Sequence, residues 1–396
     1  MKKIFEKLSS RNFNLVFIFI LLSVLLIKIP TGFENQIDKN AIRVKGQIIS
    51  VNNSQIFDAG LIKTGDQRVT IKILKGKFKN KTIEAQNQLL GQMDRDKIFK
   101  PGDKVFTVLT LNEDEEIIYA SAREHYRLGL EFFLFLLFAL LLAGFGGFTG
   151  IKALVSFVFS GLVIWKILIP MLLKGYDPIL TTFLISSLLC GAIIFLVAGI
   201  NKKGLTALAG SFAGVFVSCI MALFFTSKFH IHGAIMPFAE TLLYSGFAHL
   251  NLTKIYTGAV FIACSGAVMD LAMDVSASME EIKKKKPDIS AKELIKSGLS
   301  VGRTVTGTMT TTLLLAYSGG YITLLMAFMA QGIHLSTTFN LVYVSAEILK
   351  TLAGSFGLVT VAPFTAIAGG FIFSLKSKKR ENLTVKHSVN AVEDLF

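Results

Sequence analysis

Residues 264–290 read CSGAVMDLAMDVSASMEEIKKKKPDIS. The first half of this stretch is apolar enough to cross a membrane, yet it carries Asp270 and Asp274 one helical turn apart. A carboxylate at bilayer depth costs several kcal/mol unless it is paired or solvated, so its presence there indicates a functional site. The stretch therefore predicts a membrane-spanning helix with a polar site on one face.

The composition supports a membrane protein. The chain has 396 residues, of which 52% are hydrophobic and 17% charged, whereas soluble domains have about 25% charged residues. The net charge of +14 comes from Lys and Arg that flank apolar runs, and no nucleic-acid-binding pattern accompanies it. Cys190, Cys219 and Cys264 all lie in apolar runs, so neither a disulfide framework nor a cysteine metal site is predicted.

The fold class we predict is a polytopic all-α membrane protein of about eight transmembrane helices, with a small all-β domain inserted after the first helix. Each apolar run is close to the ~20 residues that a bilayer requires. Residues 1–30 are interpreted as an uncleaved signal anchor, because no small-x-small cleavage site follows. A break is expected at Gly319-Gly320. The predicted spans are 13–30, 129–148, 151–173, 178–199, 205–226, 255–275, 304–330 and 351–375.

The distribution of basic residues predicts the orientation. With the N-terminus inside, the cytoplasmic segments hold 19 Lys and Arg, against four lysines in the short outer segments. Both termini are therefore predicted to be cytoplasmic, in a bacterial plasma membrane. Residues 128–375 form the seven-helix membrane domain, residues 376–396 a basic cytoplasmic tail, and residues 31–127 lie outside. In that outer segment apolar and polar residues alternate, which predicts a barrel or sandwich of roughly five strands.

Asp270 and Asp274 are the predicted ion-coupling or relay residues. Their spacing places the two Cβ atoms roughly 5–6 Å apart on one helix face. Like charges that close cannot both ionise freely in a low dielectric, which is the physical basis of a proton relay. An alternative applies to Asp274, which lies about 30 Å along the helix from Lys254: it is solvated by the inner headgroups or pairs with Arg303.

The following span supplies candidate partners. Its threonines crowd one or two turns, and we expect Thr308, Thr311 and Thr312, with Arg303, to line a polar cavity at the depth of Asp270. Packing between helices is the alternative role for these hydroxyls. Glu347 is either a second charged partner or an interfacial residue. The predicted helix-packing glycines are Gly210, Gly214, Gly266 and Gly307.

A short amphipathic cytoplasmic helix is expected between these two spans, at 279–300. Asp288 or Ser290 would cap it, and Glu293 stands three residues after Ser290 as in a capping box.

No enzyme, metal site or cofactor is predicted. His230 and His232 form an HxH without further obvious ligands. There is no P-loop, nucleophile elbow or HExxH motif. Asp177 and Asp270 do not fit an intramembrane aspartyl protease, because Asp177 precedes Pro178 in an outer turn and the second motif lacks Gly-x-Gly-Asp.

The sequence resembles the YibE/F family of bacterial multi-pass membrane proteins. The specific motifs are GAVMDLAMDVSASMEEI (266–282) and GRTVTGTMTTTLLLAY (302–317), and the outer segment contributes TIKILKGKFKNKTIEAQN (70–87). The chain departs from the family pattern at Thr304 and Thr311, where Asp and Asn are expected. The order of Asp helix, amphipathic helix and Thr-rich span is also similar to that of proton-driven translocators of the RND and SecDF type.

Two functions from different classes follow. The first is an ion-coupled transporter or translocation component that acts on an unknown small solute or ion through Asp270. The second is a scaffold or receptor whose outer β domain binds a partner. The expected partners are the lipid bilayer and either another membrane protein or a second copy of the chain, without nucleic acid.

Overall fold

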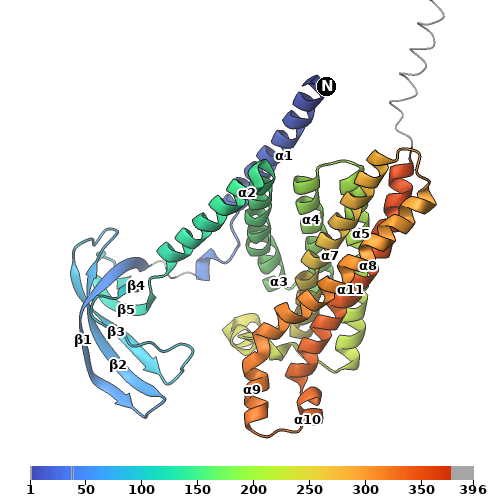
Figure 1. Cartoon of the computed structure of the whole chain (residues 1–396). Helices are drawn as coiled ribbons and strands as arrows, with labels where there is room; N and C mark the ends of the chain where they lie inside the picture. The colour runs from blue at the N-terminus through green and yellow to red at the C-terminus, as the bar shows by residue number, and fades with distance from the viewer. Residues whose placement is uncertain (1, 37, 39, 376–396) are drawn as a thin grey trace, which may run out of the picture. The chain divides into compact units, whose positions relative to one another are not determined.

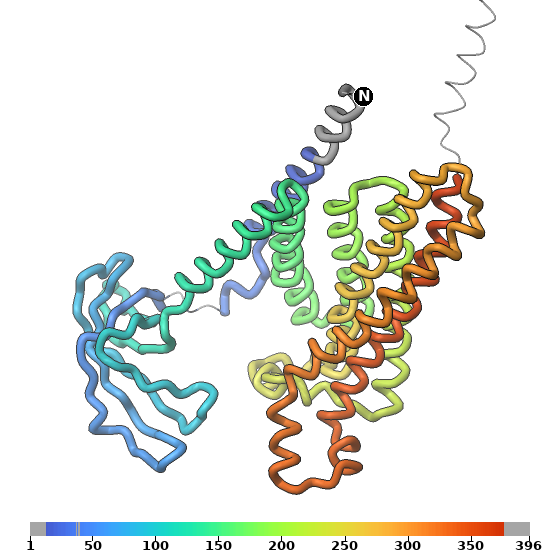
Figure 2. Tube along the Cα trace, in the orientation of Figure 1, coloured from blue at the N-terminus to red at the C-terminus, as the bar shows by residue number. Residues whose placement is uncertain are grey.

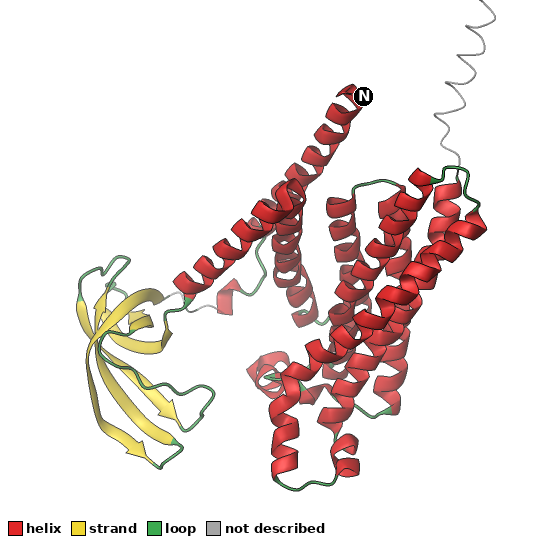
Figure 3. Ribbon diagram, in the orientation of Figure 1, coloured by secondary structure: helices red, strands yellow, loops and turns green. Residues whose placement is uncertain are grey.

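We describe the structure of residues 2–36, 38 and 40–375 in a computed structural model. The chain divides into two compact units, residues 32–145 and the two segments 1–31 and 146–396. Strands occur in the first unit, and the second unit is helical (Figures 1 and 3). The predicted tail at 376–396 lies outside the described residues.

The β unit is a closed five-stranded barrel, which confirms the prediction from alternating residues. The strand order around it is β1-β2-β3-β5-β4, with β4 pairing back onto β1. All pairs are antiparallel except β3 with β5. This order is that of the OB-fold. The strands are β1 (Ala41–Asp58), β2 (Lys63–Ile73), β3 (Thr82–Leu90), β4 (Lys104–Leu111) and β5 (Ile117–His125).

The barrel interior follows the period of two in each strand. Val69, Ile71 and Ile73 of β2 and Val105 and Leu109 of β4 are almost completely buried, because alternate residues of a strand point to one face. Polar side chains are buried there too, among them Gln67, which is 0% exposed, and Asn87, which is 3% exposed.

Gln67 attaches the segment before β4 to the barrel wall. Its Nε2 donates to the carbonyl oxygen of Phe99 at 2.9 Å, and its Oε1 accepts from the amide of Phe99 at 2.9 Å. Asn87 donates to Gln67 Oε1 at 3.0 Å and to the Lys97 carbonyl at 2.7 Å. The Phe99 ring is thereby held at 0% exposure.

Among the described residues, six helical stretches are long and apolar enough to cross a membrane, whereas the sequence predicts about eight. Two differences account for this. The N-terminal helix α1 (Lys2–Lys28) has an apolar part, Phe13–Lys28, that is shorter than the other stretches. The predicted spans 129–148 and 151–173 form one stretch, Leu128–Leu173, interrupted by non-helical backbone at Gly147 (φ 53°, ψ −132°). Glycine adopts such a φ without steric cost.

That first stretch has three helical parts. They are α2 (Leu128–Val163), a π-helical turn (Ile164–Leu168) and α3 (Ile169–Leu173). Pro170 stands at the start of α3, and its missing N–H explains why the regular hydrogen-bond ladder changes just before it.

The centre of the helical unit is a bundle of α4 (Pro178–Ala198), α5 (Lys202–Lys228), α7 (Leu252–Lys285), α8 (Ala291–Ser318) and α11 (Val342–Ser374). Helix α11 packs against α5, α7 and α8 (Figure 1). Its glycines allow this, because small residues let helix backbones approach closely. Short elements complete the unit, including α6 (Ala239–Leu242), α9 (Ile322–Ala330) and α10 (Leu335–Asn340).

The predicted amphipathic helix at 279–300 is wrong as a separate element. Helix α7 runs on to Lys285 and α8 begins at Ala291, so the two form one long hairpin (Figure 2). Ser290 caps α8 with Glu293 in a capping box, as one of the two alternatives predicted. The side chains buried in the hairpin explain its continuity: Met279 packs on Gly298, and Val275 packs on Gly302.

The predicted break at Gly319-Gly320 is present. Helix α8 ends at Ser318, and a 3₁₀ turn covers Gly319–Tyr321 before α9.

Candidate functional site: two carboxylates in a groove of the helical bundle

Asp270 and Asp274 line one pocket on the side of the helical bundle. The pocket has a volume of about 400 Å³ and lies where α4, α7 and α8 meet. Of the described residues that line it, the two aspartates alone are charged. The other lining residues are Ile193, Ile194 and Val197 of α4, Met269 and Met273 of α7, and Met309 of α8.

The rotation of α7 explains why the two carboxylates face this groove. Val268, Leu271, Ala272 and Val275 are 0% exposed and point into the bundle core. The opposite face of the same helix is exposed and carries both aspartates. It also carries small residues along its length, namely Ala259, Ala263, Gly266 and Ala277. Within the groove itself the two carboxylates lie among aliphatic and methionine side chains.

The predicted threonine lining is wrong. Neither Thr308, Thr311 nor Thr312 lines the pocket, and α8 contributes Met309 instead. Thr308 donates to the Val305 carbonyl at 3.0 Å and Thr312 donates to the Thr308 carbonyl at 3.1 Å. Threonine in a helix often bonds back to its own preceding turn in this way. These side chains, with Thr311, lie on the exposed face of α8.

Arg303 does not pair with Asp274. Among the described residues no ion pair joins Arg303 to either aspartate. Arg303 is exposed on α8. It lies six residues before Met309, which corresponds to a rotation of about 120° around the helix. Its side chain therefore starts on a different face of α8 from the one that lines the groove.

Two of the four predicted packing glycines make close approaches. A Cβ at Gly210 would overlap the Thr365 hydroxyl of α11, and one at Gly214 would come 2.7 Å from Val268 and 2.9 Å from Val361. The prediction is wrong for Gly266 and Gly307, because apart from the adjoining helix backbone no described atom lies within 4 Å of a Cβ built at either position.

The prediction missed other glycines that allow close packing. A Cβ at Gly302 would come 2.7 Å from Ala362 Cβ, and Gly298, Gly357, Gly369 and Gly370 are similarly crowded. The spacing Gly298-x-x-x-Gly302 was a signal that could have identified two of them.

Glu347 lies apart from the aspartate pocket and pairs with its own helix. Lys350 Nζ lies 2.7 Å from Glu347 Oε2 and 5.1 Å from the centre of the Tyr317 ring. Among the described residues, neither Glu347 Oε2 nor the buried Tyr317 hydroxyl has a hydrogen-bond partner of regular geometry. Glu347 is therefore a charged residue with a local counter-charge.

His230 and His232 line a second surface pocket, beside Lys228 of α5 and the start of α11. Among residues 2–36, 38 and 40–375, no group of three or more His, Cys, Asp or Glu is placed to share a metal ion.

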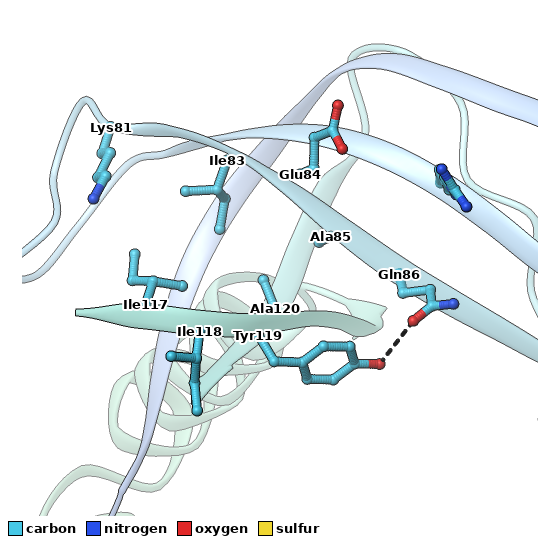
Figure 4. Close-up of a pocket in the computed structure, with 10 residues that line it drawn as sticks. Lys81, Ile83, Glu84, Ala85, Gln86, Ile117, Ile118, Tyr119 and Ala120 are labelled. Atoms are coloured by element: carbon cyan, nitrogen blue, oxygen red, sulfur yellow. Dashed lines mark hydrogen bonds between the residues drawn. The ribbon is translucent and has the colours of Figure 1, made fainter. Parts of the chain in front are cut away.

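The β-barrel has a pocket of its own, of about 420 Å³, between β3 and β5 (Figure 4). These two strands share one paired position, Gln86 with Ser121, so their edges separate along the rest of their length. Ile83 and Glu84 of β3 and Ile118 and Tyr119 of β5 line the opening. The Tyr119 hydroxyl donates to Gln86 Oε1 at 3.3 Å across it.

Apolar helices of membrane-spanning length and a small β-barrel unit define a multi-pass membrane protein with an inserted β domain. The chain belongs to the YibE/F family: the YibE/F-like protein family matches residues 134–375, and the YibE/F family N-terminal domain matches residues 43–123. No curated protein and no solved structure matches the chain. The similarity to RND and SecDF translocators stays a prediction.

Proposed function

We propose that this membrane protein is an ion-coupled secondary transporter or translocation component in which Asp270 and Asp274 carry a proton or cation. One observation carries the proposal: both carboxylates line the same pocket, and every other lining residue is apolar. Carboxylates that are retained within membrane-spanning helices mark ion pathways and proton relays. The three methionines of the lining are flexible side chains that can repack when an occupant changes.

We further propose eight crossings, in a bacterial plasma membrane. The short helix Phe13–Lys28 would count as one, and the stretch Leu128–Leu173 would be divided at Gly147 into two. Both termini would then lie in the cytoplasm and residues 31–127 outside, as the basic residues predict. The role we propose is that of a carrier and not of an enzyme.

Proton flux into proteoliposomes tests the proposal. The full-length chain would be compared with Asp270→Asn and Asp274→Asn across a panel of candidate solutes. We expect Asp270→Asn to lose at least about tenfold of solute-dependent flux, because an amide cannot release a proton. Asp274→Asn should lose less, since Asp274 lies about 6 Å closer to the cytoplasmic end of α7.

Glu281→Gln is the matched control. Glu281 is exposed on the same helix, beyond the pocket, so its removal should leave flux unchanged. Equal flux from Asp270→Asn and the unmodified chain, at equal protein levels, would exclude ion coupling through this residue.

A second candidate function is a scaffold or receptor whose β-barrel binds a partner. The open pocket between β3 and β5 favours it, because separated strand edges offer unpaired backbone groups to a ligand. Deletion of residues 35–125 should then abolish function, whereas Asp270→Asn should reduce only assembly or stability.

A further inference from the structure

Charges of opposite sign lie on the outer surface of the α7–α8 hairpin. Asp270 and Asp274 are exposed on α7 and Arg303 is exposed on α8. Among the described residues, none of the three takes part in an ion pair. Within a bilayer an unpaired charge of either sign costs free energy. We therefore expect a counter-charge to reach this surface from another molecule.

The hairpin register places the two signs of charge at one depth. Met279 lies against Gly298, and Val275 lies against Gly302. Continuing these pairs places Asp274 level with Arg303 to within about 2 Å along the helix axes. Yet Arg303 starts on a face of α8 about 120° from Met309, which lines the groove. Asp274 and Arg303 therefore lie at the same depth but point in different directions. Each can pair with the opposite charge of a second copy of the chain more readily than with the other residue of its own copy.

Small residues surround these charges on both helices. On α8 the exposed residues beside Arg303 are Thr304, Gly307, Thr308 and Thr311. Apart from the adjoining backbone of its own helix, no described atom lies within 4 Å of a Cβ built at Gly307 or at Gly266 on α7. Small residues at such spacing let helices approach closely within a membrane. A helix could therefore come near enough for ion pairing, whereas lipid tails offer the aspartates no counter-charge.

We propose that this surface is the interface with a second copy of the chain, in which Arg303 of each copy pairs with Asp274 of the other. A two-fold axis along the membrane normal keeps both copies at equal depth, and it makes one surface complementary to itself. Asp270, one turn further along the same face, then lies beside the guanidinium supplied by the other copy. In such a dimer Arg303 of the other copy adds a positive charge to the aspartate pocket. This proposal does not require that the protein transports an ion.

The test is a charge exchange between two differently tagged full-length chains expressed in the same membranes. One chain carries Arg303→Glu and the other carries Asp274→Arg. Either variant alone faces like charges in both symmetric pairs, whereas the mixed pair restores one attraction and retains one native pair. Co-purification of the tags and photobleaching steps in lipid nanodiscs would report association.

We expect the unmodified chain to be dimeric, each variant alone to lose at least about tenfold of its dimer, and the mixed pair to recover most of it. Lys296→Glu is the control for charge reversal, because Lys296 is exposed on the same helix nearer its start; it should leave the dimer intact. Thermal unfolding of each variant separates loss of association from loss of the fold.

Three outcomes would overturn the proposal. The unmodified chain could be a monomer in every lipid tested, and the counter-charge of Arg303 would then be a lipid phosphate. Both single variants could remain dimeric, or the mixed pair could associate no better than either variant alone. Loss of proton flux in Asp270→Asn with an intact dimer would support the proposed transport function independently.

Discussion

Gly210 of α5 and Thr365 of α11 are in such close contact that no side chain fits between the two helices at this point. A Cβ at position 210 would overlap the Thr365 hydroxyl, and Thr365 is 0% exposed. Replacement of Gly210 by Ala must therefore push α5 and α11 apart or displace Thr365. Overpacking of this kind costs about 1–3 kcal/mol, and we expect a lower thermal unfolding midpoint in detergent.

Gly161→Ala is the matched control for that substitution. Gly161 is a helical glycine in α2, and apart from the adjoining helix backbone no described atom lies within 4 Å of a Cβ built there. Alanine there should leave the midpoint unchanged or raise it, because alanine favours a helix over glycine by about 1 kcal/mol. A Gly210→Ala protein as stable as Gly161→Ala would contradict the close approach of α5 to α11.

The Glu347–Lys350 pair should show strong coupling in a double-mutant cycle. Both side chains are about a quarter exposed, so removing Lys350 alone leaves a poorly solvated carboxylate. We expect Lys350→Met to destabilise the protein by about 1–3 kcal/mol and the double variant with Glu347→Gln to recover part of the loss. If the two substitutions changed the free energy of unfolding in detergent additively, the interaction between Glu347 and Lys350 would not stabilise the protein.

In the barrel, Gln67 should control the order of the segment before β4. Gln67→Leu removes the partners of the Phe99 amide and carbonyl and of Asn87. Each buried polar group left without a partner costs about 1–3 kcal/mol. Hydrogen exchange of the full-length chain should show faster exchange at residues 97–99. Gln88→Ala, at an exposed position of β3, should leave the exchange rate at residues 97–99 unchanged. Equal exchange rates at these residues in the two variants would contradict the role of the Gln67 hydrogen bonds.

Asp177 gives a pH dependence at the start of α4. Its hydrogen bond to Lys254 at 2.6 Å, and then the amide of Leu180, hold the pKa of this carboxyl below its usual range. A carboxyl whose pKa is lower in the folded state stabilises the fold above its unfolded pKa of about 3.9. That stabilisation is lost as the pH falls from about 4 through the folded pKa.

The stability difference between the unmodified chain and Asp177→Asn should therefore be present at pH 6 and small near pH 3. Because both partners are about 40% exposed, we expect less than about 1 kcal/mol, reduced further by salt. Asp177→Ala also removes the N-cap and should cost about 1 kcal/mol more. Unfolding midpoints across this pH range check the prediction, and a difference that grows on acidification would contradict it.

The sequence by itself determined the features that depend on neighbouring residues. Apolar runs of membrane-spanning length specified the helices, and alternation specified the five strands, because each pattern reports its own local geometry. Ser290 and Glu293 specified the start of α8, since a cap needs only residues three apart. The spacing of Asp270 and Asp274 placed both on one helix face, and both line one pocket.

Only the tertiary structure decided which face of each helix meets which neighbour. Met309 instead of Thr308 or Thr312 reaches the aspartate groove because Gly302 and Leu313 of α8 are buried, which fixes the rotation of that helix. The same rotation places Gly302 against Ala362 of α11 and leaves Gly307 exposed on the opposite side, although both glycines lie in one sequence motif. Helix rotation follows from the summed burial of residues far apart in the chain, and a sequence pattern confined to one helix does not contain that sum.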